Sequence, residues 1–355
     1  MKRLLILLYF NFSICTIAFG TTWYVTTNGN GNGRSPYTPA RDLALIMQNA
    51  QYGDSILVAS GNYTSSHSRA NYSYAFKLKS GVKIFGGYHP GTYFNPSLRN
   101  WEMYGSVLDG STSFIIRNHT VVIHNADENT LLDGFYITGG VANSFYPDYL
   151  EHSTYPAGHL VNRIKSHSGG GVYVANTSVV LRNLKVYKNC ADINGGGIYT
   201  ENSICLLDNV SVYENGAGVN GGGICLKKSL VSIVNSEIMG NDAFFGGGVY
   251  FMYESTTIEN DGRLIQPQIS NTQIHRNSSL HKGGGVYFAA ATTTFVNTQI
   301  YYNGQSNILG RGIYAAVADA CHTCSEPIDL TSGIWTSDGV CRELETGGVI
   351  IHSNF

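Results

Sequence analysis

The spacing of glycine is the feature that most constrains the fold. Five Gly-Gly-Gly triplets, each followed by a β-branched residue, begin at residues 169, 195, 221, 246 and 283. The starts are 26, 26, 25 and 37 residues apart, so the fourth unit carries an insertion, and a degenerate sixth copy follows at 310–314. Near-equal units of this length predict a solenoid, in which each unit packs on its neighbours instead of around one globular centre.

Two asparagine columns keep the same step as the glycine triplets. The first column is Asn183, Asn209, Asn235, Asn271 and Asn297, and the second, six residues later in each unit, is Asn189, Asn215, Asn241, Asn277 and Asn303. Stacked strands place equivalent residues about 4.8 Å apart, so one side-chain amide can hydrogen-bond to the next. Asparagine also tolerates the left-handed backbone of a sharp corner. We therefore expect two asparagine ladders at corners of the stack.

Apolar residues predict a closed interior for each coil. Alternation after each triplet points one column inward, beginning with Val172, Ile198, Ile224 and Val249. Two further inward columns are Leu181, Leu207, Ile233, Ile269 and Phe295, and Val186, Val212, Ile238, Ile274 and Ile300. Three apolar columns give each coil a closed interior.

A leucine-rich repeat is the alternative for units of this length. Residues 181–189 match its Leu-x-x-Leu-x-Val-x-x-Asn template, but later units replace the second leucine by Ser236, Thr272 and Thr298. The glycine-flanked strand of each unit also leaves little room for a helix. The all-β coil is therefore favoured.

The N-terminal residues 1–20 are typical of a secretory signal peptide. Lys2 and Arg3 precede an apolar stretch, and Ala18-Phe19-Gly20 forms a small-x-small cleavage site, which predicts a mature chain starting at Thr21. No later segment is long and apolar enough to span a bilayer. We expect a protein that is secreted or displayed at the cell surface.

The remaining chain divides into three parts. Residues 21–110 are expected to form an N-terminal cap and first irregular coils, with a short amphipathic helix whose apolar positions are Leu43, Ile46, Met47 and Ala50. Pro39 is expected in its first turn. Residues 111–314 are expected to form the main β-helix, with loop insertions at 141–168 and 253–266.

Residues 315–355 are expected to form a cysteine-containing loop and a final incomplete coil. Residues 349–354 repeat the Val-x-x-Asn corner at a distance of two coils from Asn303. This predicts that the C-terminal coil edge is exposed or partnered, or that the gene product is shortened.

Composition and cysteine usage restrict the partners. Only 13% of residues are charged, the net charge is −2, and no basic cluster is present, which argues against nucleic acid. The cysteines beyond residue 20 are compatible with disulfides in an oxidising compartment, although their pairing stays open. Cys321-x-x-Cys324 with Cys341 is an incomplete zinc-ligand set, so no metal and no cofactor are expected.

Three early segments carry a family resemblance. Residues 53–63 (GDSILVASGNY), 76–88 (FKLKSGVKIFGGY) and 131–140 (LLDGFYITGG) are similar to the openings of secreted bacterial proteins with the pectin-lyase-like fold. The later Gly-Gly-Gly-Ile-Tyr units resemble polymorphic outer-membrane-protein repeats. The resemblance implies an all-β fold, a single right-handed parallel β-helix with a short N-terminal capping helix. This scaffold hosts lyases, hydrolases and adhesins alike, so it does not by itself imply an activity.

No catalytic residue is assigned. Pectin-active hydrolases of this fold share paired-aspartate, Gly-His-Gly and Arg-Ile-Lys motifs, and only Arg163-Ile164-Lys165 is present here, which favours coincidence. Glycoside hydrolysis needs two carboxyl groups about 5 to 9.5 Å apart across the substrate. The repeats supply no pair of acids in one column.

Tyrosines are the candidate ligand-binding residues. Tyr173, Tyr199, Tyr250, Tyr287 and Tyr314 form one column, broken by Cys225, that alternation points outward. Such a column stacks on sugar rings or, more commonly, supports cross-strand packing. The insertion at 141–168 adds Tyr146, Tyr149 and Tyr155, either as a binding loop or as a flap packed on the helix.

The function predicted from these features is a non-enzymatic, adhesin-like surface or extracellular protein. Its ligand would be a polysaccharide or a surface protein. The first alternative is a polysaccharide lyase or glycoside hydrolase, and the second is a structural stalk.

Overall fold

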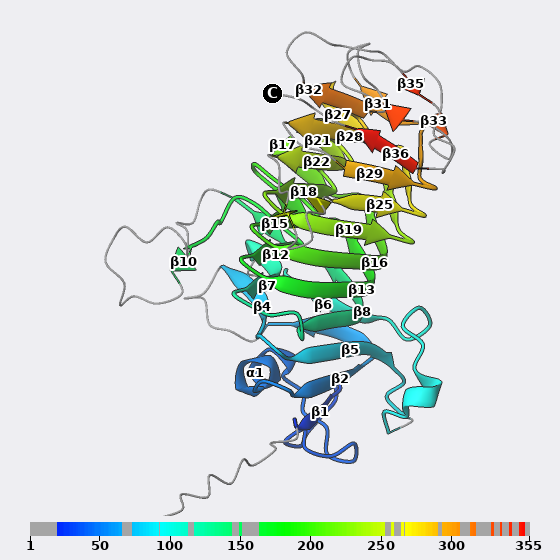
Figure 1. Cartoon of the computed structure of the whole chain (residues 1–355). Helices are drawn as coiled ribbons and strands as arrows, with labels where there is room; N and C mark the ends of the chain where they lie inside the picture. The colour runs from blue at the N-terminus through cyan, green and yellow to red at the C-terminus, as the bar shows by residue number, and fades with distance from the viewer. Residues whose placement is uncertain are drawn as a thin grey trace, which may run out of the picture.

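The computed structural model describes residues 20–65, 73–91, 93–112, 117–143, 149–150, 163–252, 257–258, 264–265, 267–289, 293–305, 313–316, 328–329, 334–335, 341–342 and 348–351. The strands stack into one long coil that rises from β1 at one end towards β32 and β36 at the other (Figure 1). The chain is all-β apart from one α-helix and one short 3₁₀-helix among these residues.

Three sheets of mainly parallel strands run along the stack. Sheet 1 contains β1 (Thr22–Val25), β2 (Ser55–Ala59), β5 (Lys83–Tyr88), β8 (Leu131–Thr138), β13 (Ser178–Tyr187), β16 (Ile204–Tyr213), β19 (Leu230–Val234), β25 (Gln268–Ser270), β29 (Thr293–Val296) and β36 (Gly348–Ile351). The same sheet includes β3 (Gly61–Thr64), β6 (Ser106–Asp109), β20 (Glu237–Met239), β26 (Gln273–His275), β30 (Gln299–Tyr301) and β33 (Ile328–Asp329).

The other two sheets complete each coil. Sheet 2 contains β4 (Tyr74–Leu78), β7 (His119–His124), β12 (Val172–Ala175), β15 (Ile198–Glu201), β18 (Ile224–Lys227), β22 (Val249–Met252), β28 (Val286–Ala289) and β32 (Ile313–Ala316). Sheet 3 contains β9 (Val141–Ala142), β14 (Cys190–Ala191), β17 (Gly216–Asn220), β21 (Asp242–Phe245), β27 (Ser278–Lys282) and β31 (Gly304–Gln305).

Short hairpins mark the two predicted insertions. The first insertion carries the antiparallel pair β10 (Tyr149–Leu150) and β11 (Arg163–Ile164), and the second carries β23 (Thr257–Ile258) and β24 (Leu264–Ile265). A further antiparallel pair near the C-terminus is β34 (Ile334–Trp335) and β35 (Cys341–Arg342).

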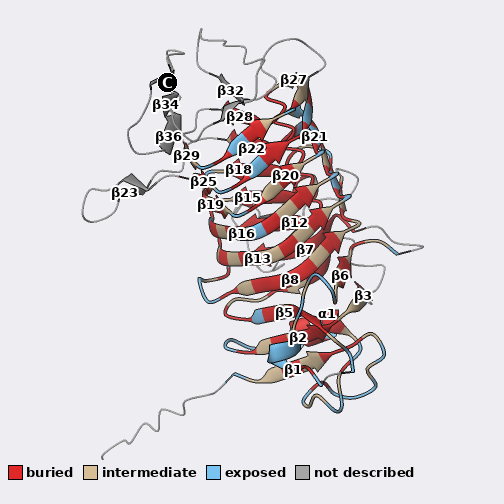
Figure 2. Ribbon diagram, turned by 90° about the vertical axis from the view of Figure 1, so that its right-hand side faces the viewer, coloured by how far each residue is buried: buried red, intermediate tan, exposed pale blue. Residues whose placement is uncertain are grey.

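The expected interior columns are confirmed. Residues of all three predicted apolar columns belong to one buried cluster, and the strand surfaces that line it are buried along the stack (Figure 2). Strands one unit apart pair in parallel with equivalent residues opposite each other, as Ile198 does with Ile224. Glycine is required where coils touch: a Cβ at Gly196 would lie 2.2 Å from the carbonyl oxygen of Gly216, and Gly195 has a φ of +61°.

Both asparagine ladders are also confirmed. The first occupies left-handed corners, with φ between 45° at Asn297 and 56° at Asn209, and its side chains are mostly exposed. The second is buried, and in it each amide oxygen accepts from the preceding coil: Asn241 Oδ1 accepts from the backbone N and Nδ2 of Asn215 at 3.0 Å each. The buried ladder therefore ties successive coils together through their interior.

The N-terminal helix is present but starts later than expected. Helix α1 (Leu43–Asn49) buries Leu43 and Met47 and packs beside β4, the first strand of sheet 2. Asp42 is its N-cap and accepts a hydrogen bond from Leu45 N at 2.9 Å. The placement of Pro39 in the first turn is wrong, because the Asp42 cap fixes the start of the helix after it.

The C-terminal strand does not add another parallel coil. Strand β36 pairs antiparallel with β29, and β33 pairs antiparallel with β30. Strand β36 thus runs back along the edge strand β29, where it can satisfy backbone groups of that edge, and the corner expected at 352–354 lies outside the described residues.

Candidate functional site

The predicted tyrosine column is in register but covered. Tyr173 pairs with Tyr199, Cys225 lies between Tyr199 and Tyr250, and Tyr287 follows Tyr250. These rings lie on the face of sheet 2 opposite the interior columns, in a separate buried cluster. Tyr173 is fully buried, and Tyr287, the most exposed of the four, is 9% exposed.

The outward direction expected for this column holds, but the rings are covered, which favours the cross-strand packing alternative over stacking on sugar rings. Tyr314 continues it in register opposite Tyr287, although its side chain is not described. Tyr250 and Tyr287 stack at 4.9 Å with an interplanar angle of 3°, so their ring faces are occupied by each other. The column acts in cross-strand packing.

The first insertion helps to cover this column. Ile164 of β11 is fully buried in the same cluster as Tyr173 and Tyr199. Tyr149 lies in β10, paired with Ile164, and its side chain is not described, whereas Tyr146 and Tyr155 lie outside the described residues. The described base of the insertion is thus packed on the helix.

A charged cluster lies beside the covered column. Glu201 Oε1 is 2.7 Å from Lys165 Nζ and 3.0 Å from Lys227 Nζ, and Tyr199 Oη donates to Glu201 Oε2 at 3.2 Å. Burial acts to raise the pKa of Glu201, but the two ammonium groups outweigh it and lower that pKa. Lys165 belongs to the Arg-Ile-Lys sequence, so the structure gives that sequence an ion-pairing role.

A second outward column, on sheet 1, is more accessible. It directly follows the apolar column that ends at Ile300 and consists of Tyr187, Tyr213, Met239, His275 and Tyr301, paired in register from coil to coil. All but His275 are half-buried, and we call this set the open column. This column was not predicted from the sequence, although the same alternation that assigns Val186 inward points its neighbour Tyr187 outward.

The rings of the open column are stacked along the helix axis. Tyr187 and Tyr213 are 5.2 Å apart at 5°, and His275 and Tyr301 are 4.8 Å apart at 7°. Burial raises the pKa of Tyr213 to about 12, so its phenol stays protonated at neutral pH. The column therefore presents ring edges and hydroxyl groups outward, with the ring faces turned to neighbouring coils.

Polar side chains run parallel to the open column. The neighbouring outward positions are Tyr136, Lys185, Ser211, Glu237, Gln273 and Gln299. Tyr301 Oη donates to Gln273 Oε1 at 2.8 Å, and His275 Nε2 lies 2.9 Å from Glu237 Oε1. Two adjacent columns thus offer hydroxyl, amide, carboxylate and ammonium groups beside aromatic edges.

The N-terminal end of this face holds an aromatic and cationic group. Lys185 Nζ lies 4.7 Å from the ring centre of Tyr136 and 5.6 Å from that of Trp101. Lys185 also donates to Tyr136 Oη at 3.2 Å. Trp101 is half-buried and meets Tyr136 edge-on at 6.2 Å, so it extends the aromatic strip beyond the regular coils.

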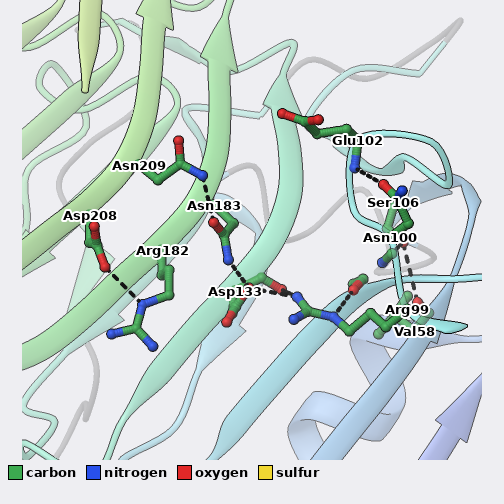
Figure 3. A network of polar contacts seen from close by, with 12 residues as sticks. Val58, Arg99, Asn100, Glu102, Ser106, Asp133, Arg182, Asn183, Asp208 and Asn209 are labelled. Carbon is green, nitrogen blue, oxygen red and sulfur yellow. Dashed lines mark hydrogen bonds and ion pairs between the residues drawn. The ribbon is translucent and has the colours of Figure 1, made fainter. Parts of the chain in front are cut away.

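A polar network borders the same face at the asparagine corner. Asp133 accepts from Arg99 Nη2 at 2.6 Å and from Asn183 Nδ2 at 2.9 Å, and Asn209 Nδ2 donates to Asn183 Oδ1 at 2.7 Å (Figure 3). Arg182 pairs with Asp208 alongside. Because Arg99 comes from the segment between β5 and β6, the network fixes that segment, and Trp101 with it, against the coils.

Comparison with known proteins agrees with this architecture. Residues 161–320 match the family model described as a right handed beta helix region. The fold is therefore a right-handed parallel β-helix. Against curated proteins, the β-helix sequence gives no match.

Solved structures similar to this β-helix include polysaccharide-processing enzymes. A pectate lyase shares 15% identity, with 86% of this chain and 80% of that chain covered and a TM-score of 0.43. Pectin methylesterase PemA from Erwinia chrysanthemi shares 12% identity over 85% of this chain and 91% of its own, with a TM-score of 0.38. An alginate lyase from Paenibacillus shares 11% identity over 83% of this chain and 98% of its own, with a TM-score of 0.29.

Within the described residues, no group of three or more His, Cys, Asp and Glu side chains is placed to hold a metal ion, while the Cys321 to Cys324 sequence lies outside them. In the same part of the chain, no helix has the length and hydropathy of a membrane span. Cys190, Cys205 and Cys225 are free thiols.

Proposed function

We propose that this β-helix is an exported, non-enzymatic protein that binds an extended glycan along the open column, as a cell-surface or outer-membrane adhesin does. The proposal rests on the in-register open column, whose tyrosines Tyr187, Tyr213 and Tyr301 are half-buried, and on the polar column beside it. Sugar-binding surfaces combine aromatic groups with hydrogen-bonding groups that fix orientation.

The repeat of the coils suits a polymer. Equivalent groups recur about every 4.8 Å along the stack, so a chain of similar units laid along the axis would meet a hydroxyl or amide at each coil. Tyr213 Oη and the side chains of Glu237 and Gln273 would supply these contacts. Because the ring faces are stacked on each other, hydrogen bonds from the ring edges, not stacking on sugar faces, would carry most of the affinity.

Export is the second part of the proposal and is supported by the signal-like composition of residues 1–20. Fractionation of producing cells tests it directly. The expected result is the β-helix in the medium or on the cell surface, and retention in the cytoplasm would contradict it.

The binding test compares a half-buried tyrosine of the open column with an exposed tyrosine outside it. Purified chain is applied to an array of neutral and acidic glycans, beside the Tyr213→Ala and Tyr37→Ala variants. Tyr37 is 74% exposed in the N-terminal segment, away from the open column, and serves as the matched control. We expect Tyr213→Ala to weaken glycan binding roughly ten-fold and Tyr37→Ala to leave it unchanged, as for a residue inside and a residue outside a binding surface.

The same samples separate the alternatives. Release of unsaturated or reducing ends from the polysaccharide would identify a lyase or hydrolase and contradict the binding-only function. Absence of affinity for any glycan or surface protein, with a folded β-helix, would favour the stalk. Thermal unfolding of both variants confirms that a loss of binding is not a loss of fold.

A further inference from the structure

The first described residues converge on one buried carboxylate. Asp54, which is 5% exposed, accepts from Thr21 N through Oδ1 at 2.6 Å, and from Trp23 Nε1 and Gln51 N through Oδ2 at 2.9 Å each. Hydrogen bonds from Gln51 N and Trp23 Nε1 are expected of a carboxylate that stabilises a turn and orients an indole ring. The third donor, the backbone nitrogen of Thr21, lies at the predicted cleavage point.

We propose that hydrolysis of the Gly20–Thr21 peptide bond, in which one water is consumed and Gly20 leaves as a carboxylate, turns Thr21 N into an α-ammonium group that forms an ion pair with the buried Asp54. Removal of the leader would then complete the N-terminal cap. This inference rests on the export part of the proposed function and is independent of glycan binding. In the uncut chain the nitrogen of Thr21 is a neutral peptide amide with one hydrogen. After cleavage it carries a positive charge at the same hydrogen-bonding distance from the carboxylate.

The backbone around this bond is arranged so that cleavage here costs no sheet pairing. Strand pairing starts one residue later, at Thr22 opposite Ser55, and Thr21 O accepts from Ser55 N at 2.9 Å. A cut one residue further on would remove both that acceptor and the donor to Asp54. A mature chain that keeps both hydrogen bonds of Thr21 can therefore start no later than Thr21.

Gly20 meets two separate demands. In the uncut fold a Cβ at this exposed position would lie 1.7 Å from the carbonyl oxygen of Gly53, so the chain can pass only with glycine there. A small residue directly before the cut is also what signal peptidase requires. Cleavage removes this tight backbone approach.

The charges around Asp54 favour the pair. Burial acts to raise the pKa of Asp54, but hydrogen bonds from Gln51, Trp23 and Thr21, and the charge of Arg34, together lower it. The carboxylate is therefore ionised at neutral pH. Arg34 is the cation acting on Asp54, and its guanidinium carbon lies 3.6 Å from the ring centre of Trp23. An α-ammonium beside an ionised carboxylate has a pKa above its ordinary range of about 7.7 to 8.0.

The test uses fusions cleaved to leave chains that start at Thr21 or at Ala18, each with and without Asp54→Asn. A group whose pKa is raised on folding stabilises below its unfolded pKa, and the effect is lost as pH rises through the folded pKa. We expect the Thr21 chain to have a roughly five-fold lower unfolding equilibrium constant than the Ala18 chain at pH 6.5, as for a charge-assisted pair. The two should be equal by about pH 10, where the amine is neutral.

In the Asp54→Asn pair the two starts should unfold equally at every pH. Equal stability of the two unsubstituted chains at pH 6.5 would overturn the proposal. Should Asp54→Asn fail to fold, acylation of the amine of the unsubstituted Thr21 chain decides: we expect it to be roughly five-fold slower at pH 7 than in an unfolded peptide, and an equal rate would overturn the ion pair. N-terminal sequencing of exported protein should give Thr21, and another first residue would overturn the cleavage assignment while leaving glycan binding untouched.

Discussion

The buried asparagine ladder gives a quantitative prediction, because the loss of one amide can be followed bond by bond. In Asn241→Ala, the backbone N–H of Asn215 loses its acceptor and Val212 O loses the donor Asn241 Nδ2, which lay 2.9 Å away. Asn215 Nδ2 loses Asn241 Oδ1 but keeps Val186 O at 2.9 Å, and Asn277 Oδ1 loses Asn241 Nδ2 but keeps the backbone N of Asn241 at 3.0 Å.

The loss in free energy of unfolding follows from these broken hydrogen bonds. A buried donor left without a partner costs about 1 to 3 kcal/mol, and each further buried hydrogen bond lost contributes about 1 kcal/mol. Because one donor loses its partner and three further hydrogen bonds are lost, we expect Asn241→Ala to lower the free energy of unfolding by roughly 5 kcal/mol. Chemical denaturation followed by circular dichroism measures it, and since solenoid stability is a sum over neighbouring coils, the transition should also broaden.

The matched control comes from the exposed ladder. The side chain of Asn235 donates to Asp208 Oδ1 at 3.1 Å and accepts from Asn271 Nδ2 at 3.3 Å. Water can replace both hydrogen bonds. Glycine adopts its φ of +52° without strain, so Asn235→Gly should cost below about 1 kcal/mol. Similar losses for the two variants would refute the reasoning that burial of the amide, and not the ladder pattern itself, stabilises the stack.

Three further outcomes are expected. Glu201→Gln should destabilise the protein at neutral pH. Because folding lowers the pKa of Glu201 from 4.5, the stability advantage of the unsubstituted chain is full above pH 4.5 and shrinks as the pH falls through the pKa of the folded state. A difference in thermal unfolding that does not change with pH would contradict this. Gly222→Ala places a Cβ 2.1 Å from a backbone oxygen of the next coil and should prevent normal folding, whereas Gly216→Ala, with contacts of 3.4 Å and beyond, should fold, as soluble yield and circular dichroism would show. Exposed Cys190 should react with a maleimide in the native state, while Cys225, whose pKa is raised by burial, should react only after unfolding, as mass spectrometry of labelled peptides would show.

The candidate site was predictable in its geometry but not in its exposure. Alternation correctly placed Tyr173 and Tyr199 outside the coil interior, because neighbouring side chains on a strand point to opposite faces. Whether they meet solvent depends on Ile164, which comes from an insertion with no repeat period. The open column was not predicted because Met239 and His275 interrupt its tyrosines. Its register nevertheless follows from the apolar column beside it.

The sequence by itself determined the repeat: glycine where coils touch, asparagine at corners, and apolar columns inside, since each is imposed by local backbone geometry and a constant step between coils. Only the tertiary structure decided what lies on the outside. The cover over Tyr173, the Arg99 link to Asp133 that holds Trp101 beside the coils, and the antiparallel return of β36 onto β29 join segments far apart in the chain. Such contacts depend on packing between non-repeating segments, which no period in the sequence encodes.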